Sequence, residues 1–157
     1  LPWVDSERHR LILAFNGGIG KDLDRFSTFR LPGRPTGYEW ESLALPIVPS
    51  VAFNELFPTR YALAHVTYRY EALFFLYPYI RGSYGWIEQA RFQPDGSIQN
   101  QMDPMPAVST GVVSGAPWRS QIELNYSYNF GIYHDHGNSP PMLGRHGFFI
   151  FWSREFR

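Results

Sequence analysis

The sequence contains no cysteine. This excludes a disulfide framework and a thiolate metal site. It also has no excess of either charge, with 14 Lys and Arg against 14 Asp and Glu, so nothing indicates a nucleic-acid surface or a nucleic-acid partner. No apolar run approaches the ~18 residues that a transmembrane helix needs. Because the chain begins at Leu1 rather than at Met, we expect its N-terminus to be a boundary inside a longer protein.

Aromatic residues are abundant, at 18% of a chain whose 157 residues suit one domain. Several of them lie in residues 147–156, a β-prone and strongly apolar segment with Phe156 near the end of the chain. An exposed edge strand of this kind would promote aggregation in water. It is typical of the closing strand of a membrane β-barrel, which has one face in lipid and no free edge.

A strict alternation of apolar and polar residues runs through residues 119–130. Since successive side chains of a strand point to opposite faces, this pattern predicts a strand with one apolar and one polar face. The apolar set is Ile122, Leu124, Tyr126, Tyr128 and Phe130, and the polar set is Arg119, Gln121, Glu123, Asn125, Ser127 and Asn129. The length also fits, because a tilted membrane strand needs ~9–11 residues.

Similar alternation predicts further strands near 8–16, 61–76, 79–92 and 147–156. Pro78 is expected to form a tight link between two of them. Glycine and proline content predicts long loops at 17–60, 93–117 and 131–146. We therefore predict an all-β fold in one domain spanning residues 1–157: an antiparallel transmembrane β-barrel, or the C-terminal strands of a larger one. A soluble barrel that buries its apolar face remains the alternative.

Residues 26–38, which end in Thr36-Gly37-Tyr38, precede the predicted strand pair 61–92. This segment resembles the stretch of Omp85-superfamily (surface antigen D15-like) barrels in which an Arg-Gly-Phe/Tyr motif lies on a long loop. The Ser-Gly-Tyr version, found in the barrel of bacterial patatin-like phospholipases, is closer to this sequence. The resemblance extends over residues 8–157 in the order of the elements. It implies that the loop folds into the lumen and that outer-membrane assembly machinery reads Phe156.

The chain departs from the family pattern at two points. Thr36 occupies the position of the motif arginine, and the nearest arginine is Arg34. The acidic partner of that arginine has no clear equivalent, and both Glu71 and Glu123 are candidates for a salt bridge with Arg34. A complete superfamily barrel has sixteen strands, whereas this chain supplies about six. The resemblance therefore implies the C-terminal part of a larger bacterial outer-membrane protein.

Other polar motifs have simpler interpretations than catalysis or metal binding. Gly17-Gly18-Ile19-Gly20 is similar to an oxyanion loop, but the chain has no Gly-x-Ser-x-Gly nucleophile elbow, so we expect a turn at a strand end. His134-Asp135-His136 and His146 could bind a cation, yet a solvated loop tip is the expectation. Opposite charges such as Arg69 with Glu71 predict a lattice of salt bridges. We predict no catalytic residue, cofactor or metal.

Three functions follow from these observations. The first is a non-enzymatic outer-membrane barrel that serves as a pore, a translocation or assembly channel, or an anchor. The second is the barrel tail of a patatin-like phospholipase whose hydrolase domain lies upstream. The third is a soluble β-barrel that binds an apolar ligand. The first two predict membrane lipid as a partner, and self-association into a homo-oligomer stays open.

Overall fold

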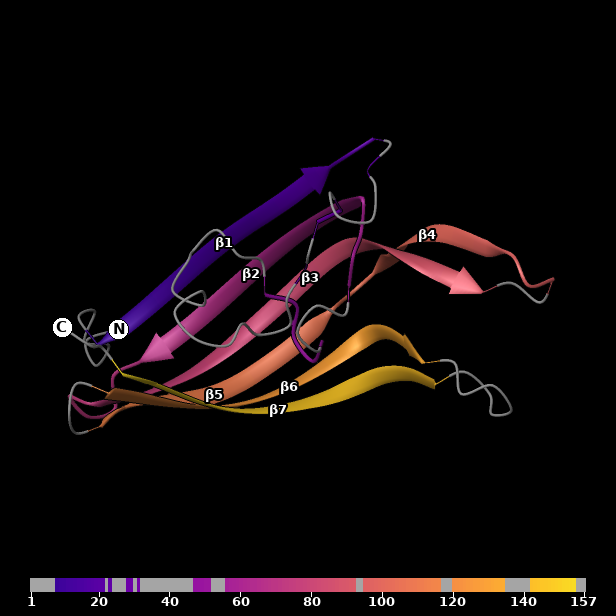
Figure 1. Ribbon diagram of the computed structural model, residues 1–157. Coiled ribbons are helices and arrows are strands. Elements are labelled where there is room, and N and C mark those ends of the chain that lie inside the picture. Colours follow the sequence, from indigo (N-terminus) through magenta and orange to yellow (C-terminus); the bar gives the residue numbers. More distant parts are fainter. Residues whose placement is uncertain are drawn as a thin grey trace.

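The protein is represented by a computed structural model, which describes residues 8–21, 23, 28–29, 31, 47–51, 56–92, 95–116, 120–134 and 142–154. Its strands form one antiparallel seven-stranded sheet (Figure 1). The strands are β1 (His9–Ile19), β2 (Arg60–Tyr70), β3 (Leu76–Phe92), β4 (Ile98–Pro104), β5 (Ala107–Ala116), β6 (Ser120–His134) and β7 (Met142–Arg154). The described residues contain no helix, and hence none that is long and apolar enough to cross a membrane.

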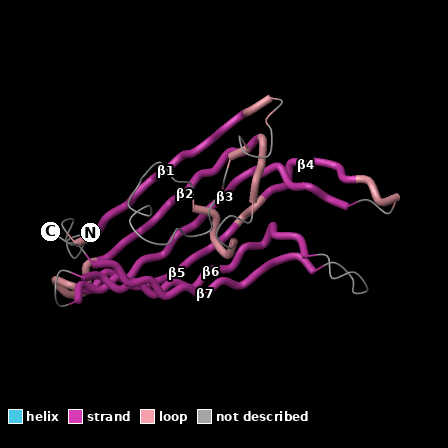
Figure 2. Tube along the Cα trace, viewed as in Figure 1, coloured by secondary structure: helices cyan, strands magenta, loops and turns pink. Residues whose placement is uncertain are grey.

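The strand order β1-β2-β3-β5-β6-β7 is a simple meander, and β4 pairs with the far end of β3. The register along β3 is the same for β4 and β5, since Trp86 pairs with Pro104 and Ser83 pairs with Ala107. The two strands are therefore one return strand, interrupted where Pro106 lacks a backbone N–H. The hairpin of β3 and β4 extends beyond the rest of the sheet, as Figure 2 shows.

Several expected boundaries were wrong. The segment 93–117, predicted to be a loop, contains β4 and β5. Pro78 lies inside β3, opposite Val112, and residues 71–75 connect β2 to β3 instead. The pairing of β2 with β3 reaches only as far as Tyr79, so β3 has a neighbour on one side at Pro78. Proline is tolerated at such an edge position because no second ladder needs its N–H.

The predicted alternation along β6 is confirmed. Ile122, Leu124 and Tyr126 are 39–44% exposed, whereas Glu123, Asn125 and Ser127 are at most 7% exposed. The register carries this division across the sheet: Leu124 pairs with Val112 and Ile150, while Asn125 pairs with Gly111 and Phe149. We call the face that carries Leu124 the apolar face and the face that carries Asn125 the inner face.

Parts of the connection between β1 and β2 cover the inner face. Val48, Val51 and Leu31 pack there with side chains from three strands and the β4–β5 junction, and together they form the main buried apolar cluster. The cluster is Leu31, Val48, Val51, Leu63, Ile87, Met105 and Ile132. Burying each of these larger side chains contributes about 1.5–3 kcal/mol. The part of this connection that was predicted to fold into the lumen, with Arg34, Gly37 and Tyr38, lies outside the described residues.

The sheet has two free edges within the part of the chain that the structure describes. There β1 pairs only with β2, and β7 pairs only with β6. The all-β, antiparallel part of the predicted fold is therefore confirmed, and the sheet is open rather than closed.

Candidate membrane-facing surface

The apolar face is built from the residues that a soluble protein would bury. Phe15 is 77% exposed, Ile150 67% and Trp152 60%, and they lie on strands at opposite ends of the sheet order. The larger exposed apolar side chains of the strands on this face include Leu11, Leu13, Phe15, Ile19, Val66, Tyr68, Ile80, Tyr84, Trp86, Val108, Ile122, Leu124, Tyr126, Phe130, Phe148, Ile150 and Trp152. Continuous apolar surfaces of this extent mark contact with another molecule or with a membrane.

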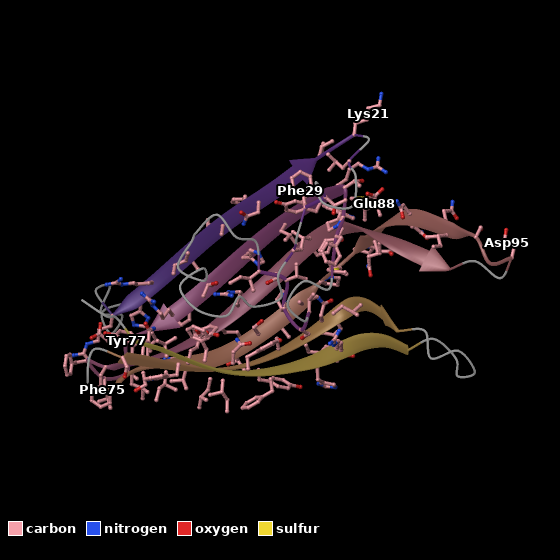
Figure 3. The ribbon with its side chains drawn as sticks, viewed as in Figure 1. Lys21, Phe29, Phe75, Tyr77, Glu88 and Asp95 are labelled. Carbon is pink, nitrogen blue, oxygen red and sulfur yellow. The ribbon has the colours of Figure 1, made fainter. Side chains whose placement is uncertain are left out.

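Aromatic residues gather toward both ends of the apolar face. Tyr84 and Trp86 pack edge to face with ring centroids 4.9 Å apart, near the ends of the strands that lead to the long β1–β2 connection. At the opposite end, Phe75 lies in the β2–β3 connection (Figure 3), and its ring centroid is 5.8 Å from that of the preceding Phe74. Trp152 lies near the end of β7. Aromatic residues at both ends of an apolar face are typical of a sheet that crosses a bilayer. Aromatic rings also lie between these ends, because Tyr68, Tyr126 and Phe148 share one row of the sheet.

Beside the buried apolar cluster, the inner face carries many buried polar side chains. The Tyr79 hydroxyl donates a 2.5 Å hydrogen bond to Glu123 Oε1, and Asn125 Nδ2 donates to the Tyr79 hydroxyl over 2.6 Å. The tyrosine reaches across β5 at Gly111, where a Cβ atom would lie 2.7 Å from the tyrosine ring and 2.5 Å from the Leu124 carbonyl oxygen. The sheet therefore needs glycine at this position.

More polar contacts continue across the inner face. His65 Nδ1 and Ser83 Oγ lie 2.9 Å apart, and Arg81 Nε donates to Thr67 Oγ1 over 2.9 Å. The Arg69 guanidinium lies over the Tyr77 ring, 5.5 Å from its centroid, and its buried Nε has no hydrogen-bond partner in the described structure. The predicted pairing of Arg69 with Glu71 is therefore replaced by a cation–π contact.

Residues 47–51 are held on the inner face by hydrogen bonds to β6. Ser50 Oγ and Ser127 Oγ lie 2.8 Å apart, and Asn129 Nδ2 donates to the Pro49 carbonyl oxygen over 2.9 Å. Ser50 has a φ of 62°, in the left-handed region that non-glycine residues rarely adopt. Glycine at 147 lets this turn approach β7, since a Cβ there would lie 2.9 Å from the Ser50 Cα. These contacts fix the turn at one place on the sheet.

A charged cluster lies beyond the apolar face, where β3 continues past Trp86. Thr59 N donates to Glu88 Oε2 over 3.1 Å, the Thr59 hydroxyl also donates to it, and Arg60 Nη2 donates to Oε1 over 3.0 Å. Burial raises the pKa of the Glu88 carboxyl, but the Thr59 hydrogen bonds and the Arg60 hydrogen bond and charge together hold it below its ordinary value. The cluster ties the start of β2 to β3.

Of the residues that the family resemblance pointed to, only the two glutamates can be located. Glu123 is on the inner face and 6% exposed. Glu71 lies in the β2–β3 connection, half-buried, and its backbone N–H donates to the Arg8 carbonyl oxygen. The motif residues Arg34, Thr36, Gly37 and Tyr38 and the terminal Phe156 lie outside the described residues.

The glycine run and the histidines do not form a reaction centre in the part of the chain that can be described. Gly17 and Gly18 belong to β1, so the expected turn does not begin before Gly20. His146 Nδ1 bonds the Tyr126 hydroxyl at 2.7 Å, and the described residues contain no group of three side chains that could hold a metal ion. Asp135 and His136 lie outside the described residues.

Sequence reasoning missed the role of Tyr79 and of the segment 47–51. The sequence predicts a strand that begins at Tyr79. Nothing in the alternation of that segment indicates the contacts that the Tyr79 side chain makes. The proline-flanked residues 47–51 have loop composition, although two buried valines within them indicate a packed turn. No protein-family model matches the sequence, no curated protein is detectably similar to it, and no solved structure matches it.

Proposed function

We propose that this chain forms part of the wall of a transmembrane β-barrel, with its apolar face in contact with lipid. The observation that carries the proposal is the inverted burial of the sheet: side chains such as Leu124 are exposed, while Asn125 and Ser127 beside them are buried. A soluble sheet with one buried face shows the opposite arrangement. A membrane barrel requires this one, because its outside meets hydrocarbon and its inside is polar.

The strand lengths and backbone pairing agree with this function. β6 has 15 residues and β7 has 13, and each exceeds the ~9–11 residues needed to cross a bilayer. A strand in hydrocarbon must have its backbone groups paired. The meander provides this pairing except along the outer edges of β1 and β7, at Pro78, and along the β3–β4 hairpin that extends beyond the sheet. The proposal therefore includes further strands at those edges, from the same protein or from a second copy.

The alternative of a soluble ligand-binding barrel predicts a covered apolar face around a cavity. Here the inner face holds hydrogen-bonded polar groups and a packed turn instead, as at Ser127 and Asn129. The apolar face would then be left in water, which costs ~25 cal/mol for each Å² of apolar surface.

The finer assignment to an Omp85-type protein of the bacterial outer membrane rests on the sequence of residues 26–38, on their place in the order of the elements, and on Phe156. We propose it as an anchor, pore or translocation module. The barrel tail of a patatin-like phospholipase is the second candidate, favoured by Thr36-Gly37-Tyr38. Upstream sequence separates them: repeated POTRA-type domains favour the channel, and a Gly-x-Ser-x-Gly motif favours the hydrolase.

Spin labelling along β1 tests the membrane orientation. The protein has no cysteine, so each single-cysteine variant carries one label. Residues 11–16 suit this experiment because the side chains on both faces are partly exposed there. In lipid vesicles, labels at Leu11, Leu13 and Phe15 should be accessible to oxygen and shielded from a water-soluble nickel chelate.

Labels at Ile12, Ala14 and Asn16 should show the reverse preference. In vesicles, the relative accessibility of the labels to oxygen and to the chelate should alternate from one residue to the next. This follows because oxygen concentrates in hydrocarbon and the chelate is excluded from it. If all six labels are more accessible to the chelate than to oxygen, the apolar face does not contact lipid and the proposal fails.

A further inference from the structure

The apolar face is hollowed between β1 and β3. A groove of about 370 Å³ lies between β1 and β3 and is lined by Phe15, Asn16, Gly17, Ala62, Leu63, Ala64, Tyr84 and Trp86. The register explains the hollow: Gly17 pairs with Ala62, which pairs with Trp86, and the next row is Phe15, Ala64 and Tyr84. Small residues form the floor, and aromatic rings form the two walls.

The groove leads toward the charged end of the sheet. In the next row toward the middle, Leu13 and Val66 carry larger side chains than Gly17 and Ala62, while Gly82 leaves the β3 side of that row open. In the opposite direction Arg60 follows Ala62 on the same face of β2, with 55% of its side chain exposed although Nη2 binds Glu88. Lys21 is exposed just beyond the end of β1 (Figure 3).

We propose that this groove is a binding site for a membrane lipid with a phosphate-bearing anionic headgroup. The inference rests on the proposed function, since the groove opens onto the face assigned to lipid. One acyl chain lies along Gly17, Ala62 and Ala64, between Phe15 and the Tyr84–Trp86 pair. The headgroup phosphate lies at the rim, where Arg60 and Lys21 supply N–H donors and positive charge.

The chemistry of the groove selects this occupant over others. A polymethylene chain fits a narrow apolar channel with an open end, and its headgroup stays at the membrane surface where the two cations lie. Arg60 retains donors beyond the one that binds Glu88, because a guanidinium has five N–H groups. A basic residue near a membrane surface raises the local concentration of anionic lipid about fivefold.

Quenching of tryptophan fluorescence by brominated lipid tests the site. One variant keeps Trp86 alone and a second keeps Trp152 alone, with the remaining tryptophans replaced by Phe; both residues are on the apolar face, and only Trp86 lines the groove. Vesicles of phosphatidylcholine contain a minor fraction of phosphatidylglycerol with brominated chains. Quenching of Trp86 should correspond to an anionic lipid content about fivefold above the bulk fraction, and quenching of Trp152 to the bulk fraction.

Three substitutions make the result specific. Lys21→Gln should reduce the enrichment at Trp86. Gly17→Leu should abolish it by filling the floor, because a Cβ at this position meets nothing closer than 3.5 Å. Gly82→Leu adds the same side chain to the same face outside the groove, where a Cβ meets nothing within 4 Å, and should leave the enrichment unchanged.

The outcomes separate this inference from the proposed function. Equal quenching of Trp86 and Trp152 by the minor anionic lipid overturns the groove site and leaves the lipid-facing surface intact. Enrichment at Trp86 that is as strong for brominated phosphatidylcholine, whose headgroup carries a phosphate but no net charge, overturns the preference for an anionic headgroup. If brominated lipid of any kind quenches neither tryptophan, the proposed function fails as well.

Discussion

The hydroxyl of Tyr79 on β3 donates a 2.5 Å hydrogen bond to the Glu123 carboxylate on β6, across the intervening strand β5. This contact is made on the inner face, where both side chains are buried. The crossing requires Gly111 beneath the tyrosine ring. Three successive strands are thus joined by one side-chain interaction as well as by their backbone ladders.

Removal of that hydroxyl should destabilise the sheet. In Tyr79→Phe, Asn125 Nδ2 loses its acceptor and Glu123 loses one donor while both stay buried. We expect a loss of about 1–3 kcal/mol in the free energy of unfolding, the cost of an unsatisfied buried polar group. Denaturant titration of the protein in vesicles, followed by circular dichroism, measures it. Tyr68→Phe, on the exposed apolar face, is the matched control and should cost less.

Gly111→Ala should be at least as damaging for a different reason. The added methyl group would lie 2.5 Å from the Leu124 carbonyl oxygen, and backbone cannot move aside as a flexible side chain can. Overpacking of this kind costs about 1–3 kcal/mol. Gly82→Ala provides the control, because its Cβ would meet nothing within 4 Å. Equal stability of the two alanine variants would contradict the role assigned to Gly111.

A charge on the apolar face should carry a cost that depends on lipid. Leu124 lies in the middle of β6, and Leu124→Arg should destabilise the protein in vesicles by ~2–4 kcal/mol if the residue is near the bilayer midplane. Gln101→Arg is the control, since Gln101 is an exposed polar residue of the β3–β4 hairpin. Reversible unfolding in vesicles gives both values. An arginine at 124 that costs no more than one at 101 would argue against a lipid-facing Leu124.

The attachment of residues 47–51 should be separable from the stability of β6. Asn129→Asp keeps the side-chain oxygen that accepts from Gly131 N, but it replaces the donor to the Pro49 carbonyl with a second acceptor. The turn should loosen, and its amide hydrogens should exchange faster while those of β6 change little. Asn100→Asp on exposed β4 is the control. Unaltered exchange at 47–51 in Asn129→Asp would show that the apolar contacts suffice.

The sequence predicts a strand reliably where its two faces differ in chemistry. Along β6, every second residue from Gln121 to Asn129 is polar, and the structure places this set on the inner face. β5 was missed because Ser109, Thr110 and Gly111 blur the contrast between faces. The serine and the glycine lie on the inner face, where small residues leave room for Tyr79 and Arg81. This reason lies in the neighbouring strands and cannot be read from β5 itself.

Prolines led to the other errors. Pro78 was interpreted as a link because proline usually ends a strand, but it occupies a position of β3 that has a neighbour on one side. The position of residues 47–51 was also beyond sequence reasoning. It depends on contacts with Ser127 and Asn129, which lie nearly eighty residues further along the chain, with sequence separations of 77 and 80. Local patterns carry no information on such pairings.

The two glutamates proposed as partners of Arg34 now differ in their surroundings. Glu123 is buried on the inner face that the β1–β2 connection covers, and it is bonded to Tyr79. Glu71 lies outside the ladders in the short β2–β3 connection. A guanidinium folded onto the inner face needs a buried carboxylate as its partner, because an unpaired buried charge is costly. We therefore predict that Arg34 pairs with Glu123.

Charge exchange tests this pairing. Arg34→Glu should place two carboxylates together and destabilise the protein by about 3–5 kcal/mol, the cost of breaking a buried pair. Adding Glu123→Arg should recover part of that loss, because the opposite charges meet again with their positions exchanged. Adding Glu71→Arg should recover nothing beyond its own effect. If Glu71→Arg rescues Arg34→Glu and Glu123→Arg does not, the loop reaches the β2–β3 connection and the predicted position of Arg34 is wrong.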